Sequence, residues 1–176
     1  MNYRTLIAAS KEHLAKYPGN DCRPGLATMF PSGARWMYDR LNELDDHNVR
    51  PFNTGTNYNL YGFLKYGICL AGSVLSCWWF LKHAPLLTPL SALCFYLLEV
   101  QFLFLFPLLL DNSRKPVLSG LNKVFEIGIG KCLLTVMPIA FFMVLGLFRK
   151  GNHLRNWHIG CLAILILYNN EVRARL

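Results

Sequence analysis

The residue whose position most suggests chemistry is Glu99, because it lies inside a long apolar stretch of the chain. A carboxylate in hydrocarbon costs several kcal/mol unless it is protonated or paired, so an ionisable residue there is a candidate functional site. Lys131, near the start of the next apolar stretch, is either its predicted partner or a residue whose side chain extends outward to the membrane interface. Gln101 lies on another helix face and is expected to hydrogen-bond to a neighbour. Glu99 is then a protonated or hydrogen-bonded residue that holds helices together, a proton or cation site, or an exposed residue beyond a span that ends earlier than predicted.

A second group with chemical potential is a charged loop formed by Asp111, Arg114, Lys115 and Lys123. Basic side chains beside a membrane can hold a lipid phosphate, and the aspartate can act on a metal or a proton. The signature of CDP-alcohol phosphotransferases and the paired aspartate-rich motif of prenyltransferases are both absent. The loop is therefore either a weak catalytic candidate or an ordinary basic loop that sets topology.

The histidines and cysteines do not follow metal-binding or redox spacing. The closest histidine pair, His153 and His158, matches neither spacing of membrane di-iron enzymes, and the run 45–47 is read as solvated. No C-x-x-C occurs among the six cysteines, which are expected to pack unpaired as small apolar residues. We therefore predict no metal site and no cofactor. The cysteines are Cys22, Cys69, Cys77, Cys94, Cys132 and Cys161.

Three long apolar runs must position these residues, at 60–81, 84–110 and 127–148. Each is long enough to cross a bilayer as a helix, since about 20 residues at about 1.5 Å rise span about 30 Å. Hydrophobic residues make up 53% of the chain, charged residues only 16%, and the mean hydropathy is +0.28. The sequence thus predicts an all-α, multi-pass integral membrane protein. A shorter apolar run at 157–168 is expected to be a membrane-associated helix whose path stays open.

The chain divides into a polar region, 1–56, and a membrane-embedded helical bundle, 57–176. Residues 1–56 show two short amphipathic helical patterns, which need a surface such as the membrane interface or a partner protein. In the first span, Gly72 and Ser76 form a small-x-x-x-small pair that lets another helix approach closely. Pro107 is expected to kink the last turn of the second span.

Basic residues set the expected orientation. Most of the formal net charge of +8 lies in 57–176, where anionic head groups explain it, and no contiguous patch indicates nucleic-acid binding. A polar start without an apolar leader predicts that the N-terminus lies in the cytoplasm. Three continuous spans would then leave Arg149, Lys150 and Arg155 outside, which conflicts with the positive-inside rule. A re-entrant break of 127–148 at Pro138 would resolve the conflict.

The preferred functional hypothesis is a small accessory or structural subunit that packs against a larger membrane protein or complex. Its aromatic-rich apolar faces also suit bound lipid, quinone or pigment. The alternative is a membrane enzyme that acts on a phospholipid or polyprenyl phosphate at the cytoplasmic interface. A lesser alternative is a proton- or cation-coupled carrier that uses Glu99.

Overall fold

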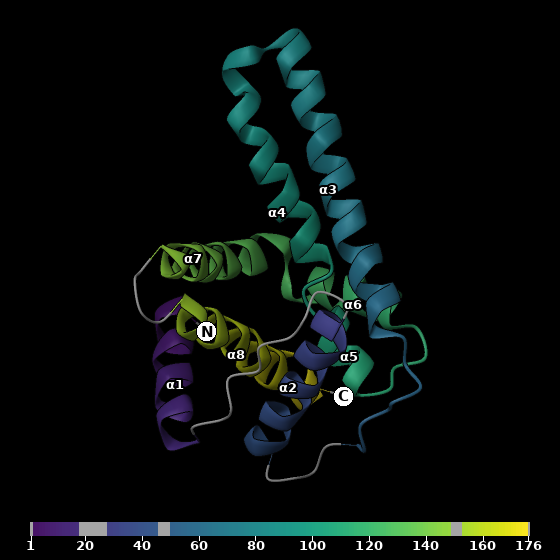
Figure 1. Cartoon of the computed structure of the whole chain (residues 1–176), viewed down its shortest axis with the longest axis vertical. Coiled ribbons are helices and arrows are strands. Elements are labelled where there is room, and N and C mark those ends of the chain that lie inside the picture. Colours follow the sequence, from purple (N-terminus) through teal and green to yellow (C-terminus); the bar gives the residue numbers. More distant parts are fainter. Residues whose placement is uncertain (1, 18–27, 46–49, 149–152, 176) are drawn as a thin grey trace.

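The computed structural model describes residues 2–17, 28–45, 50–148 and 153–175, and these ranges contain helices and no strand. A long helical hairpin stands out from a body made of the remaining helices (Figure 1). The all-α prediction is confirmed. The helices are α1 (Tyr3–Lys16), α2 (Met29–Leu44), α3 (Tyr58–His83), α4 (Ser91–Gln101), α5 (Leu105–Leu110), α6 (Pro116–Ile127), α7 (Ile129–Leu147) and α8 (His153–Glu171), with short 3-10 segments η2 (Pro85–Leu90) and η3 (Arg173–Arg175).

The hairpin pairs α3 with η2 and α4. The side chain of Asn57 caps α3 by accepting a hydrogen bond from the backbone N–H of Leu60, and η2 opens with a proline, which has no N–H to leave unsatisfied. Gly72 lies against the side chain of Leu98 on α4, where a Cβ would overlap it. The two legs are therefore in direct contact, and the tip is formed by the turn after His83.

The second predicted span, 84–110, is interrupted rather than continuous. Helix α4 ends at Gln101, and α5 begins at Leu105. In the tight turns between them, the backbone N–H of Phe102 donates a hydrogen bond to the carbonyl oxygen of Glu99. Pro107 accounts for the break, because its ring clashes with the carbonyl four residues earlier and it cannot donate to it. Every residue of α5 is buried in the body. The last part of this apolar run is thus protein core.

The third predicted span forms α7, which continues through Pro138 without a break. The re-entrant alternative is therefore wrong for this segment. Gly128, with φ of +98°, turns the chain sharply between α6 and α7, a conformation that glycine tolerates. Helix α7 runs across the direction of the hairpin, at the level where the hairpin leaves the body (Figure 1).

Helix α8 extends the predicted short run to His153–Glu171 and forms the centre of the body. It packs against α7, α1 and α2, and its apolar side chains are largely buried among them. Leu6 of α1 and Leu41 of α2 join the same core as Leu162 of α8. The surface on which the two amphipathic N-terminal helices lie is therefore supplied by the chain itself.

Three helical stretches are long and apolar enough to cross a membrane, namely Tyr58–His83, Pro85–Leu110 and Ile129–Gly146. This is the composition of an integral, multi-pass membrane protein. Five cysteines have free thiols, and Cys22 lies outside the described residues.

Candidate functional site

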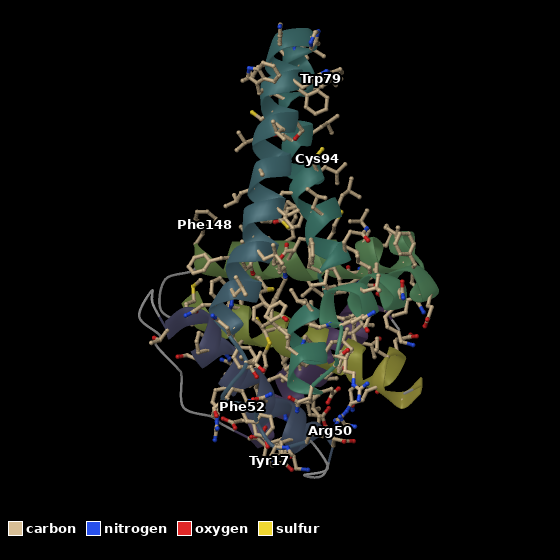
Figure 2. The ribbon with its side chains drawn as sticks, turned by 90° about the vertical axis from the view of Figure 1, so that its right-hand side faces the viewer. Tyr17, Arg50, Phe52, Trp79, Cys94 and Phe148 are labelled. Atoms are coloured by element: carbon tan, nitrogen blue, oxygen red, sulfur yellow. The ribbon has the colours of Figure 1, made fainter. Side chains whose placement is uncertain are left out.

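A polar cavity of about 860 Å³ lies in the body, between the C-terminal ends of α5 and α8 and one face of α6. Arg50, one of its lining residues, lies near the end of the body opposite the hairpin (Figure 2). The side chains that line it are mostly charged or amide-bearing. They include Asp45, Arg50, Asp111, Asn122, Lys123, Glu126, Asn169, Asn170 and Arg173.

Asp111, the predicted loop aspartate, is held on both of its carboxylate oxygens. The hydroxyl of Tyr168 donates to Oδ2 at 2.5 Å, and Nη2 of Arg173 lies 3.5 Å from Oδ1. Tyr168 is fully buried, and this burial raises its pKa above the ordinary value, with the hydrogen bond to Asp111 acting in the same direction. Asp111 is thus fixed in place by a neutral tyrosine and a guanidinium.

Arg173 also reaches a second carboxylate, since its Nη1 lies 2.8 Å from Oδ2 of Asp45. One guanidinium therefore joins the end of α2 to the end of α5. The predicted Lys123 lines the same cavity, and its Nζ pairs with Oε2 of Glu126 at 2.9 Å. The cations and anions of this cavity neutralise one another, so the geometry favours a structural polar network over an open catalytic centre.

Arg114 and Lys115, which were predicted to act with Asp111, do not line this cavity. Tyr168 and Arg173, which the sequence does not single out, contact Asp111 instead. A usable signal was present, because a polar run follows the apolar residues of α8 at its C-terminal end. What the sequence does not show is that this run returns to Asp111.

The second predicted site, around Glu99, lies at the foot of the hairpin near the last turn of α4. Glu99 pairs with Lys65 of α3, with Oε1 and Nζ 3.5 Å apart. The predicted partner, Lys131, instead pairs with Glu171 of α8 at 3.2 Å, so that expectation is wrong. The ammonium of Lys65 also lies 5.1 Å from the ring centroid of Tyr66, a cation–π distance.

Gln101 follows Glu99 on α4, and its Oε1 is buried without a hydrogen-bond partner among the described residues. The expected bond to a neighbour is therefore not seen for this oxygen. Gly72 contacts Leu98 inside the hairpin, whereas the Ser76 hydroxyl donates to the carbonyl oxygen of Ser73. These groups contribute to helix packing and offer no reactive constellation.

Within the described residues no group of three or more His, Cys, Asp or Glu side chains is placed to hold a metal ion. Asp46 and His47, and the side chain of His153, lie outside those residues. Comparison with protein-family models, with curated proteins and with solved structures finds no match.

Proposed function

We propose that this chain is a non-catalytic membrane subunit that presents its α3/α4 hairpin to a larger membrane protein or complex. The observation that supports this proposal is the hairpin itself, which projects beyond the body with only its two legs in contact (Figure 2). Large apolar side chains are exposed along α3 on more than one side. They are Leu60, Phe63, Leu64, Ile68, Leu70, Val74, Leu75, Trp78, Trp79 and Leu81.

A protein partner fits this surface because small residues interrupt it. Gly67 and Ala71 are exposed one turn apart, and a Cβ at Gly67 would meet nothing within 4 Å. Small residues at this spacing let the backbone of a second helix come close, and the resulting van der Waals packing favours helix association in lipid. The remaining apolar side chains then fill the contact on either side.

The pairing of the polar groups within the chain also supports a non-catalytic role. Asp111, Lys123 and Glu99, the groups proposed for chemistry, are each bound to a charged or hydroxyl partner within the chain. A reacting group needs an approach for substrate and a protonation state matched to its task. Self-paired groups instead fix the relative positions of helices, as a structural subunit requires.

Site-specific photo-crosslinking from native membranes tests this proposal. Leu70 on the hairpin and Leu118 on α6 are the same residue type with similar exposed fractions, 57% and 52%, so they form a matched pair. A crosslinking amino acid at position 70 should capture one protein in stoichiometric amount, and the same probe at 118 should not. Capture of lipid alone at position 70 would refute the proposal.

The enzyme alternative rests on the shared cavity that Asp111 and Lys123 line. The cations that would hold a lipid head group there are paired within the chain, Lys123 with Glu126 and Arg173 with Asp45 and Asp111. This geometry favours the subunit over the enzyme. Loss of a lipid-modifying activity in Lys123→Met, which changes a residue that lines this cavity, would reverse that preference. Loss of transport in Glu99→Gln would do the same for the carrier alternative.

A further inference from the structure

We propose that only the hairpin crosses the membrane, and that α7 lies in the plane of the bilayer surface with its exposed apolar stripe in an anionic lipid leaflet. Both termini are then on the same side, with the body. The proposal does not depend on whether a protein partner covers α3.

The direction of α7 is the first support. The hairpin follows the long axis of the molecule, and α7 runs across it (Figure 1). Two helices that cross one bilayer lie within a few tens of degrees of its normal. If α3 and α4 cross the bilayer, α7 must therefore lie parallel to the membrane plane, even though it is apolar enough to span.

The two faces of α7 differ in the way an interfacial helix requires. Val136, Ile139 and Met143 are buried, and Gly160 of α8 lies directly against Met143. The opposite face carries a stripe of large apolar residues that are all exposed. These are Leu134, Phe141, Leu145 and Phe148, spaced as one side of a helix.

This stripe faces the side from which the hairpin emerges. Helix α8, against which α7 is buried, lies on the side of α7 away from the hairpin tip (Figure 1). Phe148 lies at the level where the hairpin leaves the body (Figure 2). The apolar stripe of α7 and the apolar surface of the hairpin thus meet the membrane at the same level, and one lipid leaflet covers both.

The length of the hairpin above this level matches a bilayer. From Lys65, at its foot, to Lys82, at its tip, α3 rises about 26 Å at about 1.5 Å per residue, close to the hydrocarbon thickness of about 30 Å. Trp78 and Trp79 then lie near the far interface, where tryptophan is enriched. Glu99 and Lys65 lie near the body-side interface rather than at the centre of the bilayer.

The charge distribution selects this topology over three spans. Three spans would place Arg155 and the basic residues at 149–150 on the opposite side from Arg114 and Lys115. With α7 in the plane, Lys82 is the one lysine or arginine between Tyr66 and Ser113, so the far side carries almost no positive charge. The body is then cytoplasmic, on the side where the leaflet carries anionic lipids.

Two measurements on the full chain in sealed vesicles of phosphatidylcholine and phosphatidylglycerol test the proposal. Epitope tags at the two ends are first exposed to protease. We expect both tags to be cleaved, or both protected, within each oriented population. Tags on opposite sides would establish an odd number of crossings and overturn the proposal.

Depth is then read from a fluorescent amino acid at Phe141 or Val74, whose exposed fractions of 63% and 65% make them a matched pair. Nitroxide lipids labelled near the head group should quench position 141 more than lipids labelled deep in the acyl chain, and position 74 should show the reverse. Deepest quenching at position 141 would mean that α7 spans the bilayer. No lipid quenching there would mean that protein covers the stripe, and either result overturns the proposal.

Discussion

Tyr168→Phe removes one hydroxyl from the centre of the body and tests whether the Asp111 network stabilises the fold. The hydroxyl donates to Asp111 at 2.5 Å from a side chain with an exposed fraction of 0%. The substitution keeps the ring, which packs against Phe104 with centroids 5.8 Å apart. The change is therefore confined to the hydrogen bond.

The expected loss in the free energy of unfolding is about 1.5–3 kcal/mol, the range for a hydrogen bond to a charged group. Arg173 remains beside the carboxylate and limits the loss. A second effect appears at high pH, because the pKa of Tyr168 in the folded state lies above its ordinary value of 10.0.

The sign of the pH effect follows from proton counting. Below about pH 10 the tyrosine is protonated in both states and contributes no slope. Above it, the unfolded chain binds fewer protons than the folded chain, so stability falls as pH rises, by about 1.4 kcal/mol per pH unit for one group. Tyr168→Phe should remove this part of the alkaline slope.

Far-UV circular dichroism during titration from mild detergent into SDS measures both effects. Tyr17→Phe is the control, since Tyr17 is exposed and its ring substitution leaves the backbone carbonyl that Arg40 binds. A double-mutant cycle with Asp111→Asn should give a coupling energy of about 1 kcal/mol or more. Equal stability of Tyr168→Phe and the control, with no coupling, would refute the reasoning.

Two further predictions concern the hairpin. Glu99→Gln should destabilise the fold by about 1–3 kcal/mol, between the values for buried and exposed ion pairs. The reason is that Lys65, whose side chain is only 9% exposed, loses its carboxylate partner. The double variant Lys65→Met with Glu99→Gln removes the unpaired charge and should recover part of the loss in the same SDS titration. Gly72→Leu should lower the free energy of unfolding by about 1–3 kcal/mol, because the new side chain overlaps Leu98. Gly67→Leu should be neutral or stabilising, because a Cβ at Gly67 meets nothing within 4 Å and leucine favours the helix over glycine. Equal losses in the two variants would contradict this packing of the hairpin.

The hairpin is predictable from the sequence because its determinants are local. Apolar length sets each leg, and the polar residues before Pro85 set the turn between them. Apolar length does not predict the location of α5 and α8, because these helices are apolar for a different reason. Their side chains are buried among other helices, and hydropathy does not distinguish a protein interior from lipid.

The candidate sites show the same division. Asp111 and Lys123 were identified from their charged loop, but Tyr168 and Arg173 come from the other end of the fold, and only tertiary packing brings them together. Glu99 stands out in the sequence as an acid inside a long apolar stretch. Its partner was assigned to the wrong helix, because the choice between two lysines depends on how α3, α4 and α7 cross.

The most direct test of the central claim is a depth profile by spin-label power saturation along α7 and along α3 in lipid bilayers. Labels at Leu134, Phe141 and Phe148 should report one constant shallow depth, while labels at Phe63, Leu70 and Val74 should move deeper by about 1.5 Å per residue. A depth that changes by about 21 Å between positions 134 and 148 would contradict the account, because α7 would then cross the membrane.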